Sequence, residues 1–168
     1  MIQLADEVFA VKDDPSQLDV NQEVLERLHK INPATTSEYN EGDGPIAWVL
    51  LIPTTMDLMN RFLQGEVSEK ELFNLTPLDA KYEALYLCSA MVLEEFRRTG
   101  ITKQLSLTAI EAIRKDHPLK AAFVWAFSPE GNSIVVFKSS QHIFHILFKG
   151  FHQGRLKKEQ VTRIAHPS

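Results

Sequence analysis

The chain has 168 residues, of which 44% are hydrophobic and 24% are charged, with a net charge of −4. This length and composition predict a single globular domain over residues 1–168, large enough to bury a sizeable core. The mildly acidic balance argues against nucleic acid as a general partner. The longest apolar run, residues 46–52, is too short to span a bilayer, so no membrane partner is expected.

Cysteine usage and the N-terminus bear on the cellular compartment. Cys88 is the single cysteine, so it cannot form an internal disulfide, and residues 1–9 lack the basic and apolar regions of a signal peptide. We therefore expect a reducing, cytoplasmic setting. For Cys88 itself, a buried packing role is more common than that of a catalytic thiol.

The first part of the chain predicts a strand and then a helix. Residues 7–12 alternate enough to form a strand, and the Asp-Asp-Pro-Ser sequence of residues 13–16 predicts a turn. Residues 17–31 then show helical spacing and end before Pro33. The apolar face of this helix consists of Val24, Leu28 and Ile31.

A β-hairpin is predicted next. Residues 35–40 suit a short strand, residues 46–53 are an apolar strand, and the Glu-Gly-Asp-Gly sequence at 41–44 between them is a hairpin turn signal.

Two short helices are predicted over residues 54–76. Thr55 caps the first and Gly65 closes it, while residues 68–71 form a capping box that opens the second, which runs through Phe73. The spacing of apolar residues favours helices that pack on the core. A lid or wall for a substrate, or a dimer surface, are the alternatives.

Residues 84–93 predict a central strand that is buried on both faces, because they are almost all apolar without helical spacing. A basic turn over residues 94–103 follows. The next segment has the spacing of an amphipathic helix and ends at His117-Pro118. The predicted apolar face of this helix consists of Leu105, Ala109, Ala112 and Ile113.

The turn between strand and helix has the features of an anion site. Gly100 allows a sharp turn and a close approach to the backbone. The first turn of the helix offers unpaired N–H groups and the positive end of its dipole. Arg97, Arg98 and Lys103 add positive charge. An ordinary crossover loop with solvated arginines is the alternative interpretation.

The last part of the chain predicts further strands. Residues 121–127 suit a strand parallel to 84–93, joined to it by the crossover helix. Residues 128–132 fit either a helix start or a hairpin turn, and the β-branched run 134–137 favours a strand. A late strand is expected over 143–148. The basic tail from Arg155 is either solvated surface or a final strand.

Residues 97–102, Arg-Arg-Thr-Gly-Ile-Thr, resemble the central motif of the GNAT superfamily of N-acetyltransferases, commonly Arg/Gln-x-x-Gly-x-Gly/Ala. Val92 and Phe96 occupy positions where family members often carry a valine and an aromatic residue. The match covers about 30 residues of the chain, and it departs from the pattern at Thr102, where glycine or alanine is usual.

The resemblance implies an α/β fold of three layers. Its central sheet is mixed and mostly antiparallel, with two central strands that are parallel and splayed and with helices on both faces. The region 54–76 is then a helical insert, and 128–140 is a helix carrying a cofactor-contacting Asn132. The resemblance implies that backbone groups of Val92 and Leu93 would pair with the pantetheine arm of acetyl-coenzyme A, and that the N–H groups of residues 98–103 would hold its pyrophosphate. The implied cofactor-binding residues are Val92, Leu93, Arg97, Arg98, Thr99, Gly100, Ile101, Thr102, Lys103 and Asn132.

The implied activity is direct transfer of an acetyl group from acetyl-coenzyme A to a primary amine. The acceptor is open between a small amine, an amino acid, a peptide terminus and an antibiotic, and a homodimer is a candidate assembly. The family's usual tyrosine acid is replaced by Ser139. The family's strand glutamate is replaced by Tyr86, which is either an acid or base or, more commonly, a buried aromatic. Glu83 would face the other side of the strand.

These replacements and Thr102 motivate an alternative, a catalytically weak module of the same fold that senses a ligand or binds a protein. No metal site is expected, because His142 and His145 are three residues apart and do not share a strand face.

Overall fold

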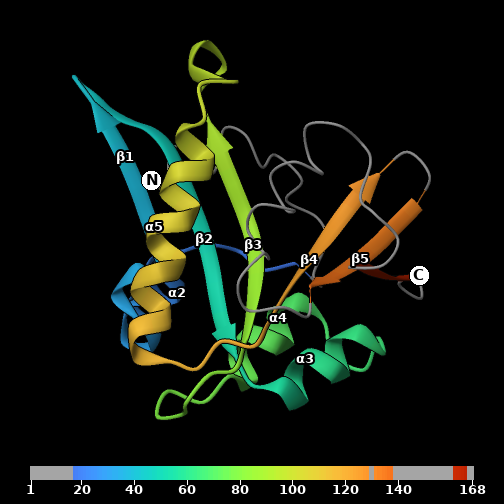
Figure 1. The fold of residues 1–168 in the computed structure, drawn as a ribbon. Helices are drawn as coiled ribbons and strands as arrows, with labels where there is room; N and C mark the ends of the chain where they lie inside the picture. The colour runs from blue at the N-terminus through green and yellow to red at the C-terminus, as the bar shows by residue number, and fades with distance from the viewer. Residues whose placement is uncertain (1–16, 129–130, 138–160, 166–168) are drawn as a thin grey trace.

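The structure of the protein, a computed structural model, describes residues 17–128, 131–137 and 161–165. The strands predicted over 7–12 and 143–148 lie outside these residues, as do His142 and His145. The described part contains a six-stranded sheet in which the strands follow chain order (Figure 1). The strands are β1 (Thr36–Glu41), β2 (Gly44–Thr54), β3 (Ala84–Val92), β4 (Ala121–Ser128), β5 (Gly131–Phe137) and β6 (Val161–Ala165).

The sheet is mixed and mostly antiparallel, as the resemblance implied. Every neighbouring pair of strands is antiparallel except β3 and β4, which are parallel. The parallel pair is short, because it holds only from Ala84↔Ala121 to Tyr86↔Phe123. Beyond Tyr86, β3 continues beside β2 to Val92, while β4 continues beside β5 and leans away in Figure 1. The two strands therefore form a fork with Tyr86 at its vertex, which confirms the predicted splay.

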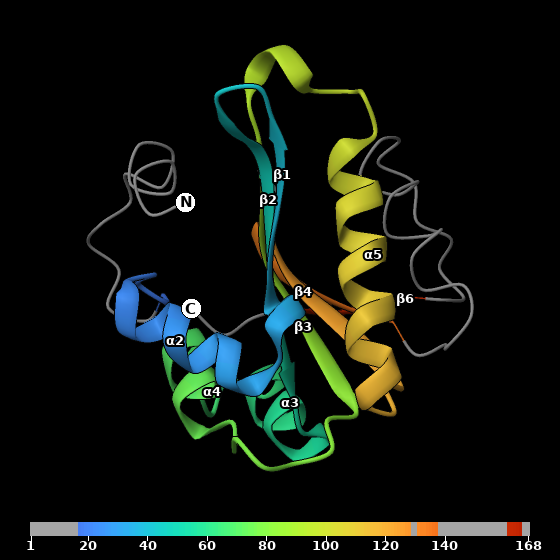
Figure 2. The same cartoon turned by 90° about the vertical axis from the view of Figure 1, so that its left-hand side faces the viewer.

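Helices cover both faces of the sheet (Figure 2). One face carries α5 (Ile101–Asp116), and the other carries α2 (Gln22–Ile31), α3 (Met56–Leu63) and α4 (Glu69–Leu75). In β2, Trp48 and Leu50 pack in the core under α2, α3 and α4, and Val49 packs in the core under α5. This alternation follows the two-residue period of a strand and explains why β2 is apolar throughout.

Helix α2 begins later than predicted. The N-cap is Asn21, whose side chain accepts a hydrogen bond from the Val24 N–H, so the helix starts at Gln22 rather than at residue 17. The Leu18 N–H is unavailable to a helix because it donates to Glu69 from 51 residues away. The helix ends at Ile31, and a short 3-10 turn, η1 (Pro33–Thr35), leads into β1.

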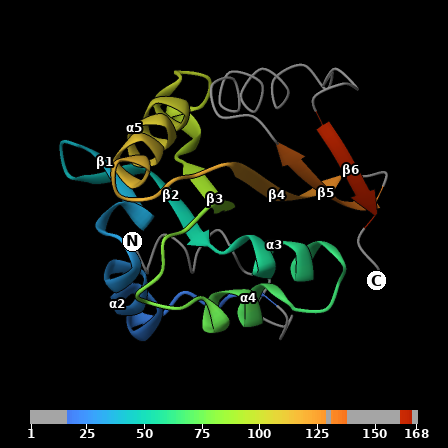
Figure 3. The ribbon, with the colours of Figure 1, turned by 60° about the horizontal axis from the view of Figure 1, so that its bottom comes forward.

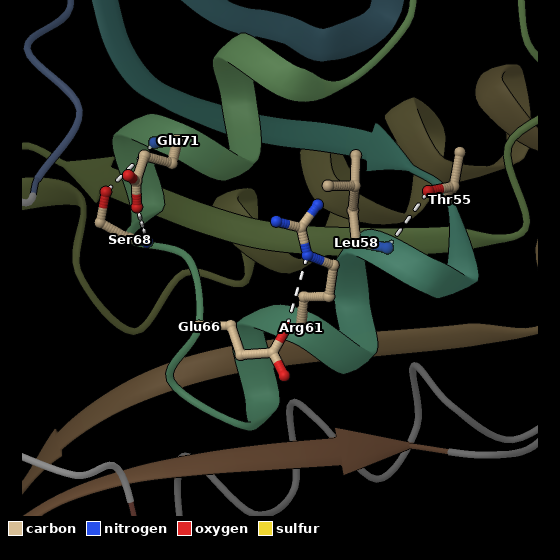
Figure 4. A network of polar contacts seen from close by, with 6 residues as sticks. All are labelled: Thr55, Leu58, Arg61, Glu66, Ser68 and Glu71. Atoms are coloured by element: carbon tan, nitrogen blue, oxygen red, sulfur yellow. Dashed lines mark hydrogen bonds and ion pairs between the residues drawn. The ribbon is translucent and has the colours of Figure 1, made fainter.

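Residues 54–76, which we call the insert because the resemblance implied one there, contain two helices that pack beneath the sheet (Figure 3). Figure 4 shows the Thr55 cap of α3 and the reciprocal capping box between Ser68 and Glu71 that opens α4. The left-handed Gly65 ends α3. The insert packs into the core, as the favoured interpretation held. Its buried residues include Leu58, Met59, Phe62, Leu63, Leu72 and Phe73.

The buried faces of α5 and β3 differ in part from those predicted. In α5 the fully buried residues are Ser106, Ala109, Ile110 and Ile113. The predicted Leu105 and Ala112 are only half-buried, because the helix is rotated by about one position, and the buried Ser106 hydroxyl donates to the Thr102 carbonyl. In β3, Ala90 is exposed rather than buried, because β4 has diverged from that half of the strand.

The prediction of a helix over residues 128–140, which followed the resemblance, is wrong. Residues Gly131–Phe137 form β5, which pairs with β4 from Ser128↔Gly131 onward, so the β-branched run decides in favour of a hairpin. The basic tail contributes β6, in agreement with its interpretation as a final strand. Among the described residues, no helix has the length and apolar character needed to cross a membrane.

Candidate functional site

The turn from β3 to α5 has an unusual backbone. A short 3-10 turn, η2 (Glu94–Phe96), follows β3, and Arg98 then has φ 66° and Gly100 has φ 83°. Glycine adopts the left-handed region freely, whereas a non-glycine residue there is uncommon and occurs more often at functional sites. Alternation of this kind turns successive N–H groups toward one side of the chain, as in anion-binding nests.

The main-chain amides of residues 98–103 have no hydrogen-bond acceptor among the residues that the structure describes. The first N–H that bonds into α5 is that of Gln104, which donates to the Gly100 carbonyl at 3.0 Å. In the described part of the chain, no backbone carbonyl accepts from the N–H groups of residues 98–103. Gly100 supplies no side-chain cap either. The turn therefore presents free donors at the positive end of a 16-residue helix.

Basic side chains surround these donors. Arg97 and Arg98 are exposed, and Lys103 is half-buried. Arg97 lies 4.0 Å from the Glu94 carboxylate, and both side chains are well exposed, so this ion pair holds the arginine only weakly. The predicted basic turn is thus assembled, with its charges able to move toward an anion.

The half of β3 that lies next to this turn pairs with β2 on one side and, among the described residues, with no strand on the other. In an antiparallel pair, successive residues point their backbone groups alternately toward the partner and away from it. The Leu93 N–H donates to the Ile46 carbonyl of the neighbouring chain at 2.8 Å, and its carbonyl accepts from Phe96. Val92, one residue earlier, therefore directs its backbone groups toward the fork. The Leu93 N–H is already bonded within the protein, so Val92 is the residue of the pair whose N–H faces the fork.

Asn132 does not join this cluster in the way the resemblance implied. It lies in β5, opposite Phe127 next to the β4–β5 turn, rather than on a helix. The structure brings together Val92 and residues 97–103 at one end of β3 and places Asn132 on the other limb of the fork.

The vertex of the fork carries a buried polar pair. Tyr86 is 1% exposed, and its hydroxyl donates to Glu69 Oε2 at 2.7 Å. Burial raises the pKa of the Tyr86 phenol well above its usual range, and the neighbouring Cys88 and Glu69 raise it further. The rings of Phe62 and Phe123 lie 5.3 Å and 5.0 Å from the Tyr86 ring. Tyr86 is therefore a buried aromatic with a bonded hydroxyl, and it stays protonated at neutral pH.

Sequence reasoning missed Glu69, which it treated only as part of a capping box. Its other oxygen, Oε1, accepts from the Leu18 N–H at 2.8 Å, and the residue is 9% exposed. One signal was present in the sequence: Glu69 precedes Leu72 and Phe73 by three and four residues, so a carboxylate stands on the apolar face of α4.

The remaining candidates have structural partners. Burial raises the pKa of the Cys88 thiol well above its usual range, and Glu69 adds to this, so the thiol is a poor nucleophile. Glu83 pairs with Lys120. The described residues contain no group of His, Cys, Asp and Glu side chains that would hold a metal ion.

Comparison with known proteins places the fold. No family model matches the chain, and no curated protein matches it. Among solved structures, it is similar to the GphF GNAT-like decarboxylase in complex with isobutyryl-CoA, with a TM-score of 0.50 and 15% sequence identity. The match covers 74% of this chain and 62% of that one, so the chain spans under two thirds of its neighbour's length. Together with the mixed, splayed sheet, this similarity shows that the chain has a GNAT-like fold.

Proposed function

We propose that the chain binds an acyl-coenzyme A at the Gly100 turn and transfers its acyl group, an acetyl group in the simplest case, to a primary amine. The observation that carries this proposal is the run of backbone amides over residues 98–103 that have no acceptor within the described part of the chain, beside the half of β3 from which β4 has diverged. Free amides at a helix N-terminus, next to a left-handed glycine, suit a diphosphate.

The fork sets the direction in which such a ligand would lie. With its diphosphate on the amides, an extended arm would pass the outward backbone groups of Val92 and run along β3 toward Tyr86. These two residues are six positions apart, which is about 20 Å in an extended strand. The thioester end would then lie toward the vertex, where the aromatic rings keep water away.

In direct transfer the protein forms no covalent bond with the acyl group. The reaction needs the amine held against the thioester carbonyl and a group that takes the amine's proton. The structural neighbour was solved with isobutyryl-CoA, which supports an acyl-coenzyme A ligand and keeps acyl groups larger than acetyl under consideration. That neighbour is a decarboxylase, so the reaction type has to be tested separately from binding.

A second candidate is a ligand-sensing module of the same fold. It is favoured by one observation: the strand position that the family gives to a glutamate holds Tyr86, whose hydroxyl is buried and already bonded. Such a module would bind acyl-coenzyme A tightly and release free coenzyme A slowly with every amine.

Isothermal titration with acetyl-coenzyme A and with NAD tests the binding step. We expect saturable binding of acetyl-coenzyme A only, weakened at least about tenfold (about 1.4 kcal/mol) by Gly100→Glu. Gly65→Glu is the matched control, because Gly65 is exposed and left-handed like Gly100 but lies at the end of α3. Absence of binding, or equal weakening by both variants, would refute the proposal.

Transfer itself is tested by thiol release from acetyl- and isobutyryl-coenzyme A with a panel of amines, peptides and aminoglycosides. Release that depends on an amine, with the acylated product found by mass spectrometry, supports the transferase. Tight binding with no amine-dependent release supports the sensing module instead.

A further inference from the structure

We propose that Glu69, acting through the Tyr86 hydroxyl, is the proton acceptor of the reaction centre at the fork. This inference rests on the proposed function and names the group that the transfer step needs. Tyr86 is the group that would touch the amine, and Glu69 is a positioning residue that receives the proton.

The pair is built by two distant parts of the chain. Tyr86 is the last residue of β3 that pairs with β4, so its backbone sits where the fork opens. Glu69 comes from the insert, at the start of α4, and its Oε2 lies 2.7 Å from the Tyr86 hydroxyl. The insert thus delivers a carboxylate to the vertex of the sheet, where the strand itself carries none.

The hydrogen bonds around Glu69 suit its ionised form. Oε2 accepts from the Tyr86 O–H, and Oε1 accepts from the Leu18 N–H. Because an ionised carboxylate only accepts, two donors on its two oxygens stabilise the charged state. A buried carboxylate held in this way is able to take up a proton.

The Tyr86 phenol is suited to pass a proton on rather than to act as the base itself. Its hydroxyl donates a hydrogen bond to Glu69, and the lone pairs of the same oxygen can still accept a hydrogen bond from an amine. Since its environment opposes ionisation, the phenol does not act as a tyrosinate. It passes a proton on only if its own proton moves to Glu69.

The transfer step balances with these two groups alone. The amine nitrogen attacks the thioester carbonyl carbon, the C–N bond forms, and the C–S bond breaks with its electron pair leaving on the coenzyme A thiolate. The extra proton on nitrogen passes to the Tyr86 hydroxyl oxygen, and the phenolic proton passes to Glu69 Oε2. Tyr86 is neutral throughout, and Glu69 returns the proton to solvent after the product leaves.

The titratable neighbours of Glu69 include groups from β3. Among them are Tyr86, which donates the hydrogen bond to Oε2, and Cys88, whose thiol interacts with the carboxylate. Leu18 contributes a backbone N–H from the segment before α2. Three charged side chains of the nearby helices have other partners: Glu71 bonds with Ser68, Arg61 with Glu66, and Arg27 with the carbonyls of Asn74 and Thr76.

The test uses Glu69→Gln and Tyr86→Phe in the full chain, with Tyr82→Phe as the matched control. Tyr82 is also fully buried, but its hydroxyl donates to the Pro77 carbonyl away from the fork. Three quantities are measured: acetyl-coenzyme A affinity by titration, melting temperature, and the pH profile of coenzyme A release, with and without an amine.

We expect both fork variants to bind acetyl-coenzyme A within about twofold of the parent and to release coenzyme A at least about 100-fold more slowly, the size of a general-base contribution. The rise of rate with pH at the acid side should disappear in Glu69→Gln. Tyr82→Phe should keep both the rate and the pH profile.

Each other outcome counts against the inference. Fork variants with rates within about twofold of the parent, or with an unchanged pH profile, overturn it, as does a parent that binds acetyl-coenzyme A without releasing coenzyme A. A parent protein that does not bind acetyl-coenzyme A overturns the proposed function itself. If one fork variant fails to fold, the other decides, because the two truncate opposite ends of one hydrogen bond.

Discussion

Replacing Tyr86 with phenylalanine isolates one hydrogen bond at the centre of the molecule. The ring keeps its contacts with Phe62 and Phe123, so no cavity term enters. What is lost is a buried bond to a charged acceptor, and Glu69 Oε2 is left without that donor. Bonds of this type contribute about 1.5–3 kcal/mol, and we expect Tyr86→Phe to lower the free energy of unfolding by that amount.

The matched change at Tyr82 sets the scale. Its hydroxyl donates to a neutral carbonyl, for which the net contribution is about 0.5–1.5 kcal/mol. Urea titrations of the parent and both variants measure the difference, with the slope of the transition required to stay constant. We expect Tyr86→Phe to be the more destabilised variant by about 1 kcal/mol. An equal or smaller loss at Tyr86 would refute the ionised, doubly bonded Glu69.

The pH dependence gives a second check on the same bond. The folded-state pKa of Tyr86 is raised well above its usual range by burial, so the phenol contributes stability that is present below its unfolded pKa of about 10. As the pH rises above about 10, the unfolded chain releases this proton while the native protein keeps it, and stability falls. The advantage of the parent over Tyr86→Phe should therefore shrink above about pH 10. A constant difference would contradict the assigned environment.

Three further changes test local features. Gly100→Ala should lower the free energy of unfolding, measured in urea, by about 1–2 kcal/mol; an added Cβ meets no atom within 4 Å, so the loss comes from the φ of 83° alone. Gly44→Ala is the control, because Gly44 has equal space and no positive φ, and it should be near neutral; equal losses in the two variants would contradict this. Asn21→Ala should remove about 1 kcal/mol by deleting the cap of α2, and an unchanged melting temperature would count against that helix start. Burial, followed by the charge of Lys81, lowers the pKa of His117 in the folded protein. As the pH falls below about 6.5, the unfolded chain therefore takes up this proton first, and the parent should lose stability. His117→Gln should lack that loss, and a pH profile of stability identical to that of the parent would contradict the prediction.

The elements whose signals are local were predictable from the sequence. The caps of the insert helices, the Gly42 hairpin turn, the left-handed Gly100 and the end of α5 at His117 all depend on residues within about four positions of one another. Where two local signals competed, over 128–140, the β-branched run decided for a strand because β4 offered it a partner edge.

The sequence by itself thus determined the order of strand, glycine turn and helix that shapes the anion site, because backbone conformation and helix ends are set by near neighbours. Only the tertiary structure decided where β3 and β4 part, that Leu93 is already bonded to Ile46, and that Glu69 meets Tyr86 across 17 residues. Those facts depend on strand register and on how the insert docks. Both are fixed by burial of side chains over the whole sheet, which no short stretch of sequence contains.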